Sequence, residues 1–278
     1  MTLRLLVGLC ATLALAPSFG FAHAGVEVLD ESTRAELVKH PESADAHMAR
    51  ARVLQMKGEW DGALEELEAA AARGADPDVV GEQRALVYLD AKFPRMAKVE
   101  IDRVLARRPD AYGLFFARGQ AWLAIGDADA AARDFGEAIA KGPRPTPEQV
   151  IARRDALVSV GKKAEAIQAL DEGMARVGQV VSLVLPAIDL EVELGRYDAA
   201  LARLDRLSAG VRPNPLWQAQ RADILERAGR KAEARAEYAN TLALIDARPP
   251  MRRGKQLDEL RQRVETALAS TDHRGDSK

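Results

Sequence analysis

The residue types that most often carry out catalysis or bind metals are scarce in this sequence of 278 residues, and they are not clustered. His40 and His47 lie on either side of Pro41, which prevents them from sharing one helix face, and His273 lies close to the C-terminus. No His-x-x-x-His pair and no His/Asp/Glu group with metal-ligand spacing is present. The sequence therefore predicts neither a catalytic histidine nor a metal site.

The motifs that bind phosphate groups or activate a serine are also missing. The sequence contains no Gly-x-x-x-x-Gly-Lys-Ser/Thr loop, no Gly-x-Gly-x-x-Gly loop and no Gly-x-Ser-x-Gly turn. Acids are numerous, but on helices they usually form solvated faces, so no two of them stand out as an acid and base pair. We therefore expect no catalytic residue, no enzyme activity and no cofactor.

The N-terminal segment is typical of a secretory signal peptide. Arg4 gives it a positive charge, residues 5–16 are uncharged and apolar, and Ala22 and Ala24 stand at the positions that signal peptidase reads. The apolar stretch is shorter than the about 20 residues that span a bilayer. We expect residues 1–24 to be cleaved off after Ala24, and an uncleaved anchor is the alternative. The single cysteine, Cys10, lies in this segment, so the mature chain would have no disulfide or thiolate site.

Composition favours stacked helices without a nucleic-acid partner. Hydrophobic residues make up 47% of the chain but aromatic residues only 5%, and alanine and leucine dominate the apolar set. These residues, with arginine and glutamate, lose little side-chain freedom in a helix. The 40 Lys and Arg residues nearly balance the 42 Asp and Glu residues, giving a net charge of −2. Binding to nucleic acid normally requires a basic surface, which this balance does not indicate.

The sequence repeats itself with a period of about 34 residues. An alanine recurs at steps of 34, 34, 35, 34 and 34 residues, and a glycine precedes most of these alanines by five residues. Glycine suits the left-handed turn that ends a helix, and alanine lets two helices approach closely. We therefore expect these residues to have structural roles: Gly58, Ala63, Ala97, Gly126, Ala131, Gly161, Ala166, Gly195, Ala200, Gly229 and Ala234.

This Gly-x-x-x-x-Ala turn, repeated every 34 residues, resembles the tetratricopeptide repeat, in which each unit is a helix–turn–helix hairpin. The resemblance covers residues 44–248. It implies six units, at 44–77, 78–111, 112–146, 147–180, 181–214 and 215–248, that stack into an all-α, right-handed superhelical solenoid. In the second unit, Lys92, Phe93 and Pro94 replace the glycine turn, although Ala97 keeps the period.

Two helices are expected to flank the array. Residues 25–43 would contain an N-terminal helix from Ser32 to His40, with Ser32 as its cap and Pro41 ending it. Residues 249–269 would contain a charged helix, Lys255 to Ala269, that covers the exposed end of the solenoid. Residues 270–278 are expected to be disordered.

One arginine recurs at the same position of the first helix in five of the six units. These residues are Arg50, Arg84, Arg118, Arg153 and Arg221. Acids recur late in the second helix, at Glu68, Asp102, Asp171 and Asp205. The arginines could pair with these acids and hold neighbouring helices together, or they could bind an anionic ligand. We favour the structural interpretation, because this position faces neighbouring helices in the family.

The resemblance also implies where a partner would bind. In such arrays the first helices of the hairpins line a concave groove, and certain positions on them face the ligand. The matching residues here hold no Lys and Asn set of the kind that clamps a terminal carboxylate. They are apolar near the middle and acidic toward the C-terminus, which suits a segment with an apolar stripe and basic residues. They are Met48, Arg52, Gln55, Glu82, Leu86, Phe116, Gln120, Ile151, Asp155, Leu185, Asp189 and Asp223.

The sequence therefore predicts an exported interaction module, periplasmic or secreted, that acts as a scaffold or adaptor for a protein or peptide partner. Two alternatives remain open: a non-catalytic regulatory subunit of an envelope enzyme, and a structural element of an envelope assembly. No nucleic-acid partner is expected, and contact with the membrane is expected only through the signal peptide.

Overall fold

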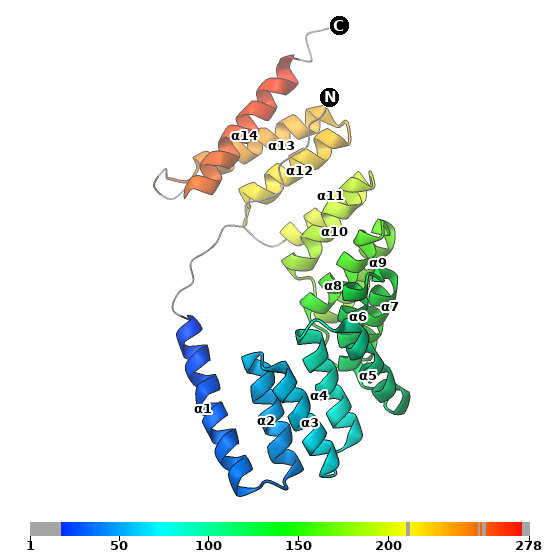
Figure 1. Ribbon diagram of the computed structural model, residues 1–278. Coiled ribbons are helices and arrows are strands. Elements are labelled where there is room, and N and C mark those ends of the chain that lie inside the picture. Colours follow the sequence, from blue (N-terminus) through cyan, green and yellow to red (C-terminus); the bar gives the residue numbers. More distant parts are fainter. Residues whose placement is uncertain (1–17, 210–211, 250, 252–253, 274–278) are drawn as a thin grey trace, which may run out of the picture. The chain divides into compact units, whose positions relative to one another are not determined.

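The computed structural model describes residues 18–209, 212–249, 251 and 254–273, with the backbone alone described for residues 18–24 and 270–273. This part of the chain forms fourteen α-helices and no strand (Figure 1). It divides into two compact units, residues 1–109 and residues 110–278, each of which is described by itself. The all-α fold class is confirmed. The bounds of the repeats and of the flanking segments stay predictions.

The first unit contains five helices in its described part, and each packs against the next one along the chain. Their bounds are α1 Ser18–Lys39, α2 Ala44–Lys57, α3 Trp60–Ala72, α4 Pro77–Asp90 and α5 Pro94–Arg107. The first helices of successive hairpins, α2 and α4, also contact each other.

The second unit contains nine helices in its described part, again with each packed against the next. Their bounds are α6 Tyr112–Ile125, α7 Ala128–Lys141, α8 Pro147–Ser159, α9 Lys163–Val177, α10 Val181–Glu193, α11 Tyr197–Ser208, α12 Pro215–Arg227, α13 Lys231–Asp246 and α14 Gly254–His273. We call the even-numbered helices α2 to α12 the A helices and the odd-numbered helices α3 to α13 the B helices.

Left-handed turns join each A helix to its B helix. The repeating glycines have positive φ angles, from 71° at Gly195 to 99° at Gly126. The second hairpin has Lys92 at this position, and its φ angle is 65°. Lys92 is the one non-glycine residue with positive φ in the described part of the chain. The turn of the second hairpin therefore has the same left-handed geometry although it contains Lys92 in place of glycine, and this strains the backbone.

Small side chains let the helices of each hairpin approach closely. The repeating alanines at Ala63, Ala97, Ala131, Ala166, Ala200 and Ala234 have no exposed surface. In α6, Gly119 has the same role from the other side, because a Cβ atom placed there would lie 2.5 Å from the Phe135 ring. Any larger side chain at these points would push the two helices apart.

Each unit has its own apolar core. In the first unit, Met48, Leu54 and Leu67 pack with Val80 and Val87, which joins the first two hairpins. In the second unit, one continuous cluster runs from Ala131 on α7 to Val264 on α14. The C-terminal helix α14 is therefore part of the core of its unit, because its apolar stripe of Leu257, Leu260 and Val264 covers the end of the cluster.

The flanking helices differ from the sequence-based expectation. Helix α1 begins at Ser18, so the prediction that Ser32 caps an N-terminal helix is wrong, and the expected cleavage point after Ala24 lies inside α1. Helix α14 continues to His273, so the prediction of disorder is wrong for residues 270–273. Residues 274–278 lie outside the described residues, as do Cys10 and residues 1–17 of the expected signal peptide.

No helix in the described part of the chain is long and apolar enough to cross a membrane.

Replacing Lys92 with glycine is expected to stabilise the first unit by about 1 kcal/mol, because a left-handed conformation costs a non-glycine residue roughly that much. Lys92→Ala is the matched control, since it removes the same side chain but keeps the Cβ atom. Denaturant unfolding should show a higher midpoint for Lys92→Gly than for Lys92→Ala. Equal midpoints would mean that the turn stores no strain.

Candidate partner-binding surface

All the expected groove residues except Gln55 fall into two sets that differ in exposure. The first set, one position per A helix, is buried or half-buried. Met48 is only 5% exposed and belongs to the core of the first unit, so the prediction that it faces a partner is wrong. The other members are half-buried, and the apolar ones pack against the core of the second unit; they are Glu82, Phe116, Ile151 and Leu185.

The second set lies four residues further along each A helix, and we call it the A-helix row. Arg52 and Leu86 are its members in the first unit, and Gln120, Asp155, Asp189 and Asp223 are its members in the second. Five of the six are exposed and Asp223 is half-buried. A spacing of four residues places the two sets on adjoining strips of each A helix. The A-helix row is therefore the more exposed of the two strips.

Neighbouring A helices are joined by polar contacts in the first unit. Gln55 on α2 donates a hydrogen bond to Asp90 on α4, at 2.6 Å, and accepts one from Gln83. Glu82 pairs with Arg108 at the end of α5, at 2.6 Å. Gln55 and Glu82 were both expected in the groove, and the structure shows that their polar atoms already have partners within the chain.

A cavity of about 500 Å³ opens between α10, α12 and α14 in the second unit. Asp189 and Asp223 of the A-helix row line it, together with Glu226. Val192 and Ile224 form its apolar part. Two arginines, Arg227 from α12 and Arg263 from α14, complete the charged lining. The structure therefore brings two of the predicted acids together, in a cavity that the terminal helix helps to form.

The acids of this cavity are in different electrostatic environments. The hydroxyl group of Tyr238 lies 2.7 Å from an oxygen of Asp223 and 2.9 Å from an oxygen of Glu226. Burial raises the pKa of Tyr238, and the two carboxylates raise it further, so this hydroxyl remains a donor. Arg263 pairs with Asp223 at 2.7 Å. For Asp189, partial desolvation and then the nearby Glu193 raise the pKa, although Arg154 and Arg227 oppose the rise.

The five recurring arginines all pair with carboxylates, which favours the structural interpretation. Three of them reach an acid sixteen residues further along, on the B helix of their own hairpin. Arg118 binds Asp134 through two hydrogen bonds of 2.7 and 2.8 Å. The other two pairs of this kind are Arg84 with Glu100 at 3.8 Å and Arg221 with Glu237 at 3.1 Å. Arg153 pairs with Glu172 on the B helix of its own hairpin at 2.7 Å, and Arg50 pairs with Asp30 of α1.

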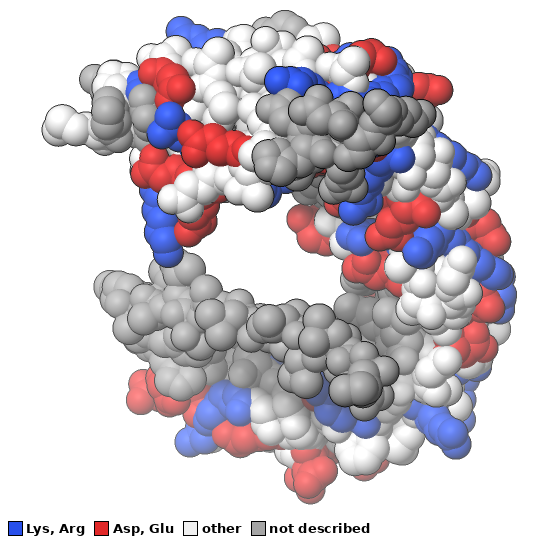
Figure 2. Space-filling view, turned by 90° about the horizontal axis from the view of Figure 1, so that it is seen from above, with Lys and Arg blue, Asp and Glu red and all other residues white. Residues whose placement is uncertain are grey.

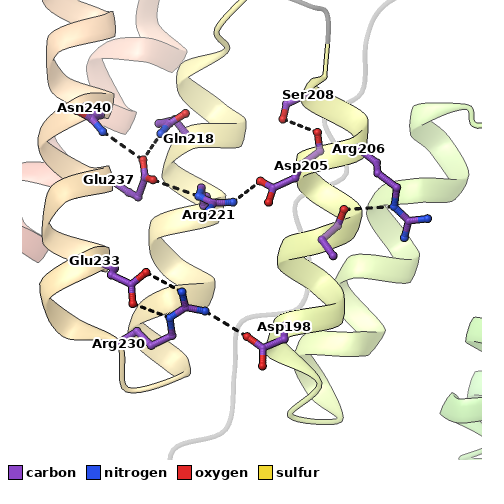
Figure 3. A network of polar contacts seen from close by, with 11 residues as sticks. Asp198, Asp205, Arg206, Ser208, Gln218, Arg221, Arg230, Glu233, Glu237 and Asn240 are labelled. Carbon is purple, nitrogen blue, oxygen red and sulfur yellow. Dashed lines mark hydrogen bonds and ion pairs between the residues drawn. The ribbon is translucent and has the colours of Figure 1, made fainter.

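The acids expected late in the B helices have different kinds of partner. Asp205 bonds a recurring arginine, Arg221 of the next hairpin (Figure 3). Asp102 pairs with Lys98 on its own helix. Arg221 thus joins the B helices on both of its sides, because it also binds Glu237.

The fifth hairpin has the opposite charge arrangement. Its A helix α10 carries Ala187 where the other units have arginine, and its B helix α11 carries Arg203 where four of the other five have an acid. Arg203 bonds Glu191 on α10 at 2.6 Å and Asp171 on α9 at 2.6 Å. Arg203 and Glu191 are only 7% and 4% exposed. The sequence analysis missed this pair because it considered only positions at which the same type of charge recurs from one repeat unit to the next.

A family model described as tetratricopeptide repeat matches residues 95–247, which is more than half of the chain, and a second such model matches residues 19–79. The chain belongs to the tetratricopeptide repeat family. A comparison with curated protein sequences finds no match.

Solved structures support the tetratricopeptide fold. PilF of Pseudomonas aeruginosa is 23% identical with a TM-score of 0.52, over 69% of this chain and 89% of that one. PilW, a widely conserved type IV pilus biogenesis factor, is 18% identical with a TM-score of 0.53, over 68% and 88%. A complex of Naa15 and Naa10 bound to HypK-THB is 13% identical with a TM-score of 0.50, and the match covers 91% of this chain but 44% of that one.

Among the described residues of this tetratricopeptide repeat protein, basic and acidic side chains are intermingled on the face shown in Figure 2. The described residues include no group of three or more His, Cys, Asp or Glu side chains that could hold a metal ion. His47, one of the histidines considered above, contacts Glu66 at 2.6 Å and the carbonyl oxygen of Pro41 at 3.0 Å. Its contacts therefore join helices within the first unit.

Replacing Arg203 with leucine is expected to lower the free energy of unfolding by about 3–5 kcal/mol, because it leaves the buried Glu191 carboxylate without a counter-charge. The double variant Arg203→Leu with Glu191→Leu should recover most of this loss. Arg230→Leu is the control, since its partners Glu233 and Asp198 are solvent-exposed, and it should have little effect. Denaturant unfolding gives the free energy of unfolding of all three variants. A double variant no more stable than Arg203→Leu would contradict the assignment.

Proposed function

We propose that this chain is an exported, non-catalytic interaction module that binds a protein or peptide partner along its A helices. The A-helix row supports this proposal most directly. Its members repeat with the period of the array and five of the six are exposed, whereas the equally periodic arginines are paired with carboxylates. Within each unit, stacked hairpins present such a row as an extended surface, which is the usual binding surface of repeat proteins.

The chemistry of the row indicates the kind of partner. In the second unit it changes from the amide Gln120 to the carboxylates Asp155, Asp189 and Asp223. Apolar side chains border it, with Leu123 41% exposed and Phe116 half-buried. A partner segment with apolar residues and basic residues would complement both features, since opposite charges guide association and apolar contact supplies affinity.

Export is supported by the charge, length and small residues of the N-terminal segment. We expect the full-length chain with a C-terminal tag to be recovered from the periplasm of its own host with Gly25 as its first residue. N-terminal sequencing identifies the first residue, and cell fractionation identifies the compartment. The variant Leu5→Arg with Leu13→Arg, which interrupts the apolar stretch, should leave the uncut chain in the cytoplasm. An uncut wild-type chain in the membrane fraction would instead support the anchor.

The binding surface can be tested by capture of partners from envelope extract with the tagged mature chain. The variant Gln120→Lys with Asp155→Lys places a positive charge at two exposed positions of the A-helix row and should reduce the captured partner at least about fivefold. Quantitative mass spectrometry of the captured proteins provides the measurement.

The control variant, Glu137→Lys with Gln168→Lys, makes the same change in net charge at exposed positions on the B helices α7 and α9. It should capture as much partner as the wild-type chain. Equal loss in both variants would point to general charge effects, and no loss in either would show that the A-helix row does not bind the partner.

A further inference from the structure

We infer that the cavity between α10, α12 and α14 binds a basic side chain, arginine or lysine, of the partner segment. This inference rests on the proposed function, because it assigns one contact of the same partner. The cavity lies at the C-terminal end of the A-helix row, and two members of the row, Asp189 and Asp223, line it. Its volume of about 500 Å³ falls in the range of ligand pockets, about 300–1,000 Å³.

The lining matches the two parts of a long basic side chain. Val192 and Ile224 provide an apolar surface for its methylene stem, and three carboxylates provide acceptors for its charged end. The lining as a whole carries three acids and two arginines, so its formal charge is −1. A cationic group is therefore the ligand that would neutralise it.

The carboxylates that line the cavity have few hydrogen-bond donors within the described part of the chain. The Tyr238 hydroxyl has one proton and lies within hydrogen-bond distance of both Asp223 and Glu226, so it can donate fully to only one of them at a time. Within the described residues, Asp189 has no hydrogen-bond or ion-pair partner. A guanidinium group has five N–H donors in a planar arrangement, and an ammonium group has three, so either could supply the missing donors.

The chain itself already places one guanidinium group at this cavity. Arg263 on α14 binds Asp223 at 2.7 Å, and its side chain is 52% exposed. Helix α14 is anchored by buried Leu257, Leu260 and Val264, so only the side chain of Arg263 needs to move. We therefore expect Arg263 to compete with the basic side chain of the partner for Asp223, and so to weaken its binding.

The test uses the mature chain and blocked arginine, N-acetyl-arginine-methylamide, with the blocked citrulline analogue as the uncharged control probe. NMR titration should show shifts at the amides of Val192 and Ile224 with the arginine probe and none with the citrulline probe. Arg263→Ala should tighten binding about fivefold, because the competing guanidinium is gone, and Asp189→Asn should weaken it about fivefold. Lys255→Ala removes the same charge from α14 two turns away and should change the affinity little.

Asp189→Asn also serves as a check on folding. The raised pKa of Asp189 means that its charged form is disfavoured in the folded chain, and this unfavourable effect is present at neutral pH and disappears as the pH falls through the folded pKa. The asparagine variant should therefore melt at or above the wild-type temperature while binding the probe less well.

Equal shifts with the citrulline probe, unchanged binding in Asp189→Asn, or weaker binding in Arg263→Ala would each overturn the inference. Tighter binding of free arginine than of blocked arginine would overturn the assignment to a polypeptide segment. Because these probes do not require the natural partner, the outcome is independent of the capture experiment. Probe binding without loss of capture in the A-helix row variant would keep the cavity and reject the proposed groove.

Discussion

Close contact between helices at alanine is the interaction on which the rest of this protein depends. A two-helix hairpin cannot cover its own apolar stripes, so each one must pack against its neighbours. The six repeating alanines, all without exposed surface, let the two helices of a hairpin meet backbone to backbone. Where the A helix contributes the small residue, as at Gly119, an aromatic ring from the B helix fills the space.

This packing brings polar side chains into partly buried positions, where charged groups need partners of opposite charge. The chain supplies these partners as ion pairs. Arg118 with Asp134, and Arg203 with Glu191, are each held by two or more hydrogen bonds of guanidinium to carboxylate. The pairs occupy the sides of the helices that face one another. Polar residues on the opposite strip of the A helices, such as Gln120 and Asp155, do not form such ion pairs between helices in the described part of the chain. They are therefore available for recognition.

The sequence predicted the features that depend on local chemistry and period. The turn glycines and the buried alanines could be found because backbone conformation and close contact restrict the residue type. The particular acid that each arginine reaches could not be found in this way, because it depends on how the helices rotate against each other. Met48 was misplaced because one resemblance was applied to every hairpin alike. The contribution of Arg263 to the cavity was beyond reach, since α14 lies outside the repeat period.

The reversed pair in the fifth hairpin has a consequence for how this protein can be rearranged. Tetratricopeptide hairpins look exchangeable, but α10 and α11 match only each other. If α10 were joined to a B helix with an acid at that position, two carboxylates would be buried together without a counter-charge, which would destabilise the hairpin. Helices α10 and α11 can therefore be moved only together. This restricts deletion, duplication and shuffling of units in evolution as well as in engineered chimeras.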